Sequence, residues 1–461
     1  QIEFEKGDQR DPANFSVARK RAILLTACLF SVLVASSSGA YALGFPSMTR
    51  DLNCTQFQAT VGIAVYALGF GVPPLVTASF SEETGRQPLY LCSGIGFLLF
   101  TIGTAEAKNI QTVLITRFFA GAFGSTGSTM VGGTVADIFA PYERGFAMSS
   151  FAVAAIGATG VGCLAAGWIE QNPHMEWRWI QWIHAIFAGV FVIMVPIFMR
   201  ETRASVLLVR LAKKMRKDGN KRIRARVEDE RAALSTLIWI SCTRPLYLLL
   251  TEPVIASFTL WVGFAWGILY VLIESIGPVF RTLHQFNSGQ VGTVYIAITI
   301  GSVLGFATNL IQERLYRKYV GTRGPEARLF APMAAAFIFP IGMFIYAWST
   351  YSKVYWIALA IGIVIIMWAL FILYLSVFTY LADCYGPFAS SALAGQSLFR
   401  NMMGMAFPLF CQQMFAKLTY HWANTIFAFI AVLMIPIPYI LFFKGPQIRA
   451  RSKFASQVMQ K

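Results

Sequence analysis

Long apolar runs recur along almost the whole chain, and short polar segments separate them. About 20 apolar residues form a helix long enough to cross the hydrocarbon core of a bilayer. The pattern predicts twelve membrane spans, at 23–45, 56–79, 88–106, 110–136, 146–170, 178–199, 248–274, 288–312, 329–349, 354–380, 389–416 and 423–443. The expected fold class is therefore an all-α membrane protein.

Composition agrees with this assignment. Of the 461 residues 56% are hydrophobic and only 13% are charged, whereas a soluble domain usually carries about a quarter charged residues. The net charge of +16 would suit a nucleic-acid partner. The basic residues, however, lie in short segments between apolar runs, without an RNA-binding aromatic motif or zinc-ligand spacing beside them. We therefore expect no nucleic-acid partner.

The distribution of positive charge predicts the orientation. Twelve spans place both termini on one side, which holds thirty Lys and Arg in its tails and loops. The opposite side holds six. Because Lys and Arg concentrate in short cytoplasmic loops, both termini are predicted to be cytoplasmic.

The segment 200–247 is the one long connection, and it carries thirteen Lys or Arg against five acids. Leu208, Leu211 and Met215 share one helical face, with basic residues around the rest. This pattern fits an amphipathic helix on the anionic cytoplasmic leaflet. A solvated basic linker fits it equally well.

Two repeated segments indicate that the halves on either side of this connection are related. ADIFAP at 136–141 follows the fourth span as ADCYGP at 382–387 follows the tenth, and IMVPI at 193–197 matches LMIPI at 433–437. The predicted organisation is an N-terminal tail (1–22), a six-helix bundle (23–199), the central loop (200–247), a second six-helix bundle (248–443) and a C-terminal tail (444–461).

The segment 81–88, SEETGRQP, lies between the second and third spans and resembles the cytoplasmic signature of the major facilitator superfamily. Glu82, Gly85 and Arg86 match its acid, glycine and arginine positions, while Gln87 stands where a second basic residue is usual. Glycine allows the tight turn. The acid and arginine are expected to act in a cytoplasmic gate between the halves.

Further motifs extend the resemblance to the fungal twelve-span drug:proton antiporter branch of that superfamily. They are RFFAG at 117–121, WRW at 177–179, RET at 200–202, PEARL at 325–329, and the residue pairs at 391–392 and 400–401. The resemblance implies twelve helices in two pseudo-symmetric bundles, with the substrate site between them near the midplane. It also implies multidrug, polyamine or organic-acid export. That branch usually carries Gly-Pro pairs in span five, but 157–167 has glycines and no proline, which makes antiport less certain than export.

Two arginines fall inside predicted spans. Burying Arg at mid-bilayer costs about 2.5–3.5 kcal/mol on insertion scales, so such residues are functional candidates. Arg117 precedes a stripe of small residues, and Arg400 shares a helical face with Gln396. In the resembled fold both spans border the cavity, so these three residues are candidates for substrate binding. The alternative for Arg117 is a bond to a backbone carbonyl or an acid that sets the position of its helix.

Trp266, Tyr270 and Glu274 follow one another at four-residue intervals in span seven. This spacing predicts an aromatic wall, with a carboxyl at its mouth, at the outer end of the span. Trp266 and Tyr270 are therefore predicted to bind substrate, and Glu274 is a candidate proton carrier. An acid solvated in the headgroup zone is the equal alternative. His184 is a second titratable candidate, for which a packing role is favoured.

Tyr374 belongs to an aromatic stripe in span ten that is typical either of packing or of a cavity wall. Its hydroxyl, which needs a partner, makes it the best substrate-binding candidate there. Asp137 and Asp383 fall at cytoplasmic span ends in the repeated motif. With Arg144, they complete the predicted cytoplasmic gate.

These features predict a monomeric, proton-coupled secondary-active exporter. It would move an organic anion, such as a dicarboxylate, or an amphipathic small molecule out of the cytoplasm by alternating access. Alternatives are a broad-specificity drug:proton antiporter, a polyamine exporter, a nutrient uptake symporter or facilitator, and a non-transporting receptor. No nucleotide loop, metal cluster or nucleophile–base spacing predicts an enzyme, a cofactor or a metal site. The expected location is the plasma membrane, with a vacuolar or other organelle membrane as the alternative.

Overall fold

A computed structural model describes residues 2–5, 7–139, 143–217, 224–225, 228 and 234–456. Its helices up to the central segment are α1 (Val17–Leu43), α2 (Phe45–Asp51), α3 (Gln56–Gly71), α4 (Pro74–Thr84), α5 (Arg86–Ala105), α6 (Ile110–Ile138), α7 (Arg144–Gln171), α8 (Glu176–Phe198) and α9 (Ala204–Lys217). The later helices are α11 (Leu234–Thr251), α12 (Pro253–His284), α13 (Ser288–Val294), α14 (Ile296–Arg323), α15 (Phe330–Trp348), α16 (Trp356–Tyr385), α17 (Ala389–Met434) and α18 (Pro436–Arg451).

Twelve crossings can be followed through the described part of the chain. Nine stretches there are long and apolar enough to span a membrane. Two of the nine, of 61 and 63 residues, reverse direction, one at Gly324 and one at Thr419, where φ is positive. The glycine-rich α6, which contains Arg117, completes the set. The prediction of twelve spans is confirmed.

The breaks between helices follow from proline and from backbone conformation. Pro73 and Pro74 lack the N–H that a continuous helix needs, and α3 gives way to α4 there. Pro253 begins α12 after an extended Glu252, so the seventh span starts at Pro253 and not at 248. It also continues to His284, ten residues past its predicted end.

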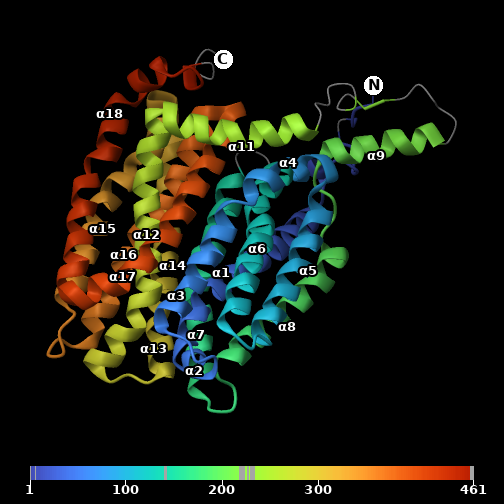
Figure 1. Cartoon of the computed structure of the whole chain (residues 1–461). Coiled ribbons are helices and arrows are strands. Elements are labelled where there is room, and N and C mark those ends of the chain that lie inside the picture. The colour runs from blue at the N-terminus through green and yellow to red at the C-terminus, as the bar shows by residue number, and fades with distance from the viewer. Residues whose placement is uncertain are drawn as a thin grey trace.

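The helices form two halves that lie side by side (Figure 1) and have the same internal packing. In the first half α1 packs on α7, α3 on α6, and α5 on α6 and α8. The second half repeats these pairs as α12 on α17, α14 on α16, and α15 on α16 and α17. The pseudo-symmetric arrangement that the repeated segments predict is therefore confirmed.

Two seams join the halves, α7 against α13 and α14, and α3 against α17. Glycines bring α7 and its partners close together, as small residues do in membrane helix packing. A Cβ atom at Gly160 would lie 2.5 Å from the carbonyl oxygen of Tyr295, and one at Gly167 would lie 2.6 Å from the Cα of Gly292. The glycine stretch 157–167 thus forms part of the interface between the halves.

Both chain ends lie at the end of the bundle where α4, α9 and α11 are found (Figure 1). We call this the cytoplasmic end, following the charge distribution, and the opposite end, with α2 and α13, the outer end. The central segment holds the helix α9 where the sequence predicts an amphipathic helix, and α11 runs across the end of the bundle. α11 passes the predicted domain boundary at 247 because the apolar run continues to the break at Glu252.

Candidate functional site

A cavity of about 1140 Å³ lies between the two halves. Its inner part is bordered by Ser38 and Tyr66 of the first half and by Trp266, Tyr270 and Arg400 of the second. Its lining continues to Arg86 and Asp383 at the cytoplasmic ends of the helices. The cavity therefore opens toward the end that holds both termini. With the termini in the cytoplasm, as the charge distribution predicts, this is an inward-facing state.

Arg400 stands at the inner part of this cavity against two aromatic rings. Its guanidinium carbon lies 4.3 Å from the centre of the Trp266 ring and 5.0 Å from that of Tyr374. These distances are those of cation–π contacts. Nη2 of Arg400 donates to the hydroxyl of Ser397 at 3.4 Å. Among the described residues, neither Nε of Arg400 nor Nε1 of Trp266 has a hydrogen-bond partner.

The remaining predicted binding residues of the second half also reach the cavity. Gln396 and Tyr374 line it, and both are mostly buried. The Tyr270 hydroxyl lies 3.4 Å from the hydroxyl of Ser38, across the interface between the halves. Gly404 leaves room for the Tyr270 ring, since a Cβ there would lie 2.8 Å from a ring carbon.

Charge along the cavity wall is mainly positive. Within the described chain, five arginines and two acids line it: Arg86, Arg144, Arg317, Arg328, Arg400, Glu313 and Asp383. Arg86 and Arg328 form ion pairs with carboxylates. The net charge of these lining residues is positive, and an excess of one sign of charge on a cavity wall attracts ions of the opposite sign.

Arg117 does not line the cavity. It is 1% exposed, and its guanidinium carbon lies 4.2 Å and 4.1 Å from the ring centres of Tyr41 and Tyr66. Its Nη1 donates to the Ser37 carbonyl at 3.3 Å, and its Nε approaches the Gly62 carbonyl at 3.5 Å. This position matches the alternative prediction for Arg117, in which it bonds backbone carbonyls and sets the position of its helix.

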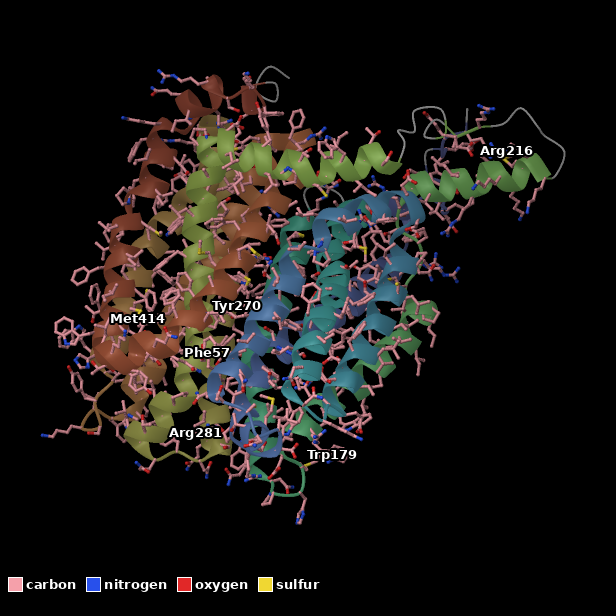
Figure 2. The ribbon with its side chains drawn as sticks, in the orientation of Figure 1. Phe57, Trp179, Arg216, Tyr270, Arg281 and Met414 are labelled. Carbon is pink, nitrogen blue, oxygen red and sulfur yellow. The ribbon has the colours of Figure 1, made fainter. Side chains whose placement is uncertain are left out.

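The two proton-carrier candidates both lie away from the cavity wall. Glu274 is 5% exposed inside α12, not at the mouth of the span, because the helix continues past it. In Figure 2, Tyr270 lies near mid-height of the molecule and Arg281 lies at its outer end. Glu274 comes between these two residues along α12. His184 is buried in the first half, 2.6 Å from the Ser36 hydroxyl and 2.7 Å from the Ile180 carbonyl, as expected of a packing histidine.

The segment 81–88 forms a charged cluster at the cytoplasmic end of the first half. Arg86 Nε donates to Asp137 at 2.5 Å, and the Arg86 amide donates to Glu201 at 3.0 Å. Gly85 has φ +97°, and a Cβ there would lie 2.1 Å from a Glu201 carboxylate oxygen. Both facts require glycine. The side chain of Glu82 lies outside the described residues.

Arg144 belongs to the same end of the first half. It donates to the carbonyls of Phe139 and Ala136 at 3.0 and 2.8 Å, which fixes the connection between α6 and α7. Among the described residues, the hydrogen-bond partners of Arg86 and Arg144 lie in the first half or, for Glu201, at the start of the segment that follows it. The predicted gate residues Arg86, Asp137 and Arg144 thus lie at one end of the first half, whereas Asp383 lies in the second.

Asp383 occupies the corresponding place in the second half. It accepts from Arg328 Nε at 2.9 Å and from the Tyr316 hydroxyl at 3.0 Å, and Arg328 also bonds Glu313 at 2.5 Å. Glu313 and Tyr316 were not among the predicted site residues. The sequence feature that could have identified them is their spacing. They are three residues apart just beyond a predicted span, and residues three apart share a helix face.

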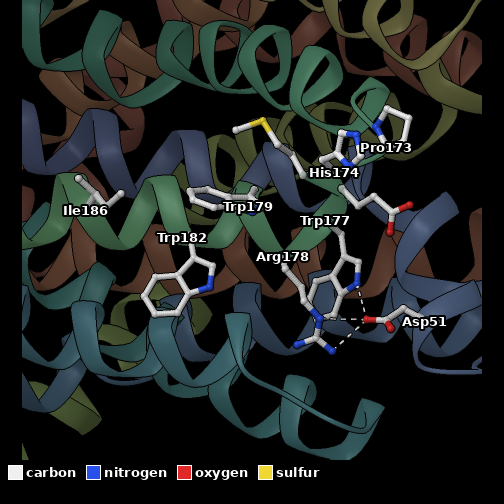
Figure 3. Close-up of a pocket in the computed structure, with 10 residues that line it drawn as sticks. Asp51, Pro173, His174, Trp177, Arg178, Trp179, Trp182 and Ile186 are labelled. Atoms are coloured by element: carbon white, nitrogen blue, oxygen red, sulfur yellow. Dashed lines mark hydrogen bonds and ion pairs between the residues drawn. The ribbon is translucent and has the colours of Figure 1, made fainter.

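A second cavity, of about 640 Å³, lies at the outer end of the first half (Figure 3). Trp177 Nε1 and Arg178 Nε both donate to Asp51 at 3.0 Å, and Arg178 also reaches the Ala105 and Ala107 carbonyls. The segment 177–179 therefore ties the ends of three helices together. Because Asp51, Trp177 and Arg178 are already paired with one another, this cavity is a poorer candidate for a substrate site than the central one.

Comparison with known proteins agrees with this architecture. The model of the Major Facilitator Superfamily matches residues 27–408. The "MFS-type efflux pump MFS2" of Trichophyton rubrum is 32% identical over 99% of this chain and 77% of its own length. The "Efflux pump radE" of Floropilus chiversii is 33% identical over 97% and 84%.

Solved structures show the same fold. The proton:xylose symporter XylE, bound to 6-bromo-6-deoxy-D-glucose, aligns with a TM-score of 0.66 at 16% identity, over 93% of this chain and 96% of that one. The human organic anion transporter MFSD10 (TETRAN) aligns with a TM-score of 0.61 at 15% identity, over 91% and 99%. By its sequence match, its fold and its relatives, this chain belongs to the Major Facilitator Superfamily of membrane transporters.

Proposed function

We propose that the protein exports organic anions from the cytoplasm in exchange for protons. The observation that carries this proposal is Arg400, held against Trp266 and Tyr374 in a cavity that opens toward the cytoplasmic end. Its relatives named as efflux pumps support export.

The ligand that fits this cluster best is a carboxylate joined to a flat ring. A carboxylate accepts two parallel bonds from a guanidinium, and Arg400 keeps Nε free while Trp266 offers a second free donor. The Trp266 and Tyr374 rings, with centres 5.5 Å apart, can stack on an aromatic or conjugated group. Because Arg117 is not on the cavity wall, one carboxylate is a better match than two.

In this proposal, the substrate crosses the membrane when the cavity closes at its cytoplasmic end and opens at its outer end. The inward-facing state admits an anion from the cytoplasm to Arg400. Closure at the Arg86 and Arg328 clusters, followed by opening at the outer end, would release it outside. A ligand drives this exchange only if it binds the two states with different affinity.

A second candidate function is broad drug export. Met130, Met148, Phe70, Phe151 and Phe378 line the same cavity and offer an adaptable apolar wall. One relative is named "Major facilitator superfamily multidrug transporter mdrA", from Aspergillus fumigatus. A polyamine is disfavoured by the excess of arginine over acids on the wall.

The test is transport in proteoliposomes with an imposed pH gradient. Salicylate serves as the aromatic monocarboxylate, succinate as the dicarboxylate, rhodamine 6G as the drug and spermidine as the polyamine. We expect salicylate to move against its gradient toward the acid side, at several times the rate of succinate, and spermidine not to move. Transport of rhodamine 6G alone would favour the drug exporter, and transport of salicylate unaffected by the pH gradient would rule out proton exchange.

We further propose that the protein lies in the plasma membrane as a monomer, with both termini cytoplasmic. The excess of Lys and Arg on the side of the termini supports this orientation. Epitope tags at either end are expected to be hidden from antibody in intact cells. A tag that is labelled without permeabilisation would contradict the orientation.

A further inference from the structure

At the outer side of the central cavity, a buried carboxyl joins the two halves. Oε1 of Glu274, on α12, accepts from the Thr60 hydroxyl of α3 at 2.8 Å and from the Gln412 amide of α17 at 2.6 Å. Gln412 also donates to Thr60 at 2.7 Å. Thr60 belongs to the first half and the other two residues to the second, so this triad holds the outer end closed.

The hydrogen bonds around Glu274 suit a neutral carboxyl. Oε1 takes two donors, as a carbonyl oxygen can, whereas Oε2 is buried without a partner among the described residues. An ionised carboxylate in this position would leave one charged oxygen unsolvated, which costs far more than burying a neutral acid. A hydroxyl at Oε2 leaves no charge to solvate.

Among the described residues, none forms an ion pair with Glu274, and Lys417, the basic residue of the neighbouring α17 beyond Gln412, is exposed. The titratable groups that reach this stretch of α12 from its neighbours are Cys411 of α17, Tyr295 before α14, and Tyr346 of α15. Toward the cavity, Tyr270 faces Ser38 of α1, within electrostatic range of Arg117 and Arg400. α3 and α13 contain no charged residue, and those of α1, α11, α16 and α18 lie in their cytoplasmic parts. On α12 itself, Arg281 lies two turns further out and bonds Ser288.

We propose that Glu274 is the proton-binding site of this transporter and that its protonation closes the outer end. When that end is open, a proton from outside water forms an O–H bond at Oε2. The neutral carboxyl can then be buried between Thr60 and Gln412. In the inward-facing state the proton leaves to water in the cavity, whose lining includes Ile273, the residue before Glu274, and Tyr270, about one helical turn away.

This inference rests on the proposed proton exchange and adds its site and its link to the outer gate. One proton enters for each closure of the outer end, because the ionised carboxyl opposes burial. Raising the pH is therefore expected to open the outer end, even in the absence of an exported molecule.

Cys411 provides a native reporter of that opening. It is completely buried, and it precedes the bridging residue Gln412. In the full-length protein in nanodiscs, a charged thiol reagent should label Cys411 about tenfold faster in mildly alkaline than in acid buffer, beyond the change expected of the thiol itself. Glu274→Gln mimics the protonated carboxyl and should keep Cys411 protected throughout. Mass spectrometry identifies the labelled cysteine.

Glu170→Gln is the matched control. Glu170 is also a buried carboxyl near the outer end, but it accepts from the amide and hydroxyl of Ser47, within the first half. This variant should keep the wild-type pH response of Cys411. An equal response in Glu274→Gln and wild type, or none in wild type, would overturn the inference.

A second variant covers the case in which Glu274→Gln does not fold. Gln412→Leu removes a donor to the carboxyl and should raise Cys411 labelling in acid buffer, and unchanged labelling would count against the triad as a gate.

Salicylate transport distinguishes failure of the proton site from failure of the proposed function. If wild type exchanges salicylate for protons and Glu274→Gln still does so, only the proton site is wrong. If wild type shows no proton exchange, the proposed function itself fails.

Discussion

The guanidinium of Arg400 lies over the face of Trp266, 4.3 Å from its centre, while the indole Nε1 and the Arg400 Nε have no hydrogen-bond partner among the described residues. The Trp266 ring contacts one face of the guanidinium, so the N–H groups at the edge of the guanidinium remain available to a ligand. Buried polar groups are rarely left unpaired in a protein. We therefore propose that the acceptor atoms of a ligand bind at these two donors.

Replacing Arg400 tests this relationship. Arg400→Gln removes the bidentate donor, and we expect its rate of salicylate transport to fall by about 30-fold or more, corresponding to the loss of about 2 kcal/mol or more for a charged hydrogen bond. Arg400→Lys should recover only part of this rate, because a lysine neither stacks nor binds bidentately. Rhodamine 6G transport, where present, should persist in both.

Arg317→Gln is a suitable control, since Arg317 is an exposed residue at the cytoplasmic mouth of the cavity. Its loss should slow salicylate entry modestly and only at low salt, because screening weakens steering by exposed charge. Equal losses in the Arg317 and Arg400 variants would show that the cavity attracts anions without a specific site at Arg400.

Arg117 is expected to behave differently. Its buried guanidinium has no acid partner and one unpaired nitrogen, so Arg117→Met should change the free energy of unfolding by no more than about 1 kcal/mol in either direction, because lost cation–π contacts offset a relieved desolvation cost. Salicylate binding to the inward-facing protein, measured by Trp fluorescence, should be unchanged. Lost binding in a folded Arg117→Met protein would place this residue in the substrate site after all.

The contrast between these two arginines shows what the sequence could not predict. Both lie in apolar spans beside small residues, and both spans border the cavity in the resembled fold. Which side chain faces the cavity depends on how each helix is rotated against its neighbours. Arg117 turns toward Tyr41 and Tyr66 because α1 and α3 present two aromatic faces there, and no local pattern in span four encodes that.

Glu274 illustrates a second limit. An acid at the end of an apolar run reads as the end of a span, yet α12 continues for ten residues beyond it. Its partners Thr60 and Gln412 are 214 and 138 residues away in sequence. By contrast, the spans and the duplicated Asp137 and Asp383 were predictable, because apolar length and repetition are local properties of the chain.

The glycines of α7 allow a prediction about the seam between the halves. Gly160→Val would place a branched side chain against the Tyr295 carbonyl and Thr299 of the other half, both within 3 Å of the first added carbon. Overpacking of this kind costs about 1–3 kcal/mol, so we expect slower salicylate transport and a lower melting temperature in detergent. Gly189→Val is the control, since nothing lies within 4 Å of its added Cβ. Equal losses of transport rate and melting temperature in the Gly160 and Gly189 variants would show that overpacking at the seam between the halves is not their cause.

The final prediction concerns α9 and the membrane surface. Lys213 and Lys214 are exposed, and each basic residue near an anionic leaflet contributes about 1 kcal/mol. Anionic nanodiscs should therefore protect the α9 amides of the full-length protein from hydrogen exchange more than neutral ones do. Replacing both lysines by Gln removes about 2 kcal/mol and should reduce this additional protection by about 30-fold.

Arg216 on the same helix supplies the matched comparison. It donates to both carboxylate oxygens of Glu228 at 2.7 and 2.8 Å, and this pairing lowers the pKa of Glu228 to about 2. The carboxylate therefore stays ionised from neutral to mildly acid pH and would become protonated only as the pH falls toward that value. Because Glu228 already offsets its charge, Arg216→Gln should reduce the lipid-dependent protection less than one lysine replacement does. A larger loss for Arg216→Gln would mean that α9 binds lipid through Arg216, and equal protection in neutral and anionic nanodiscs would mean that α9 is a solvated linker.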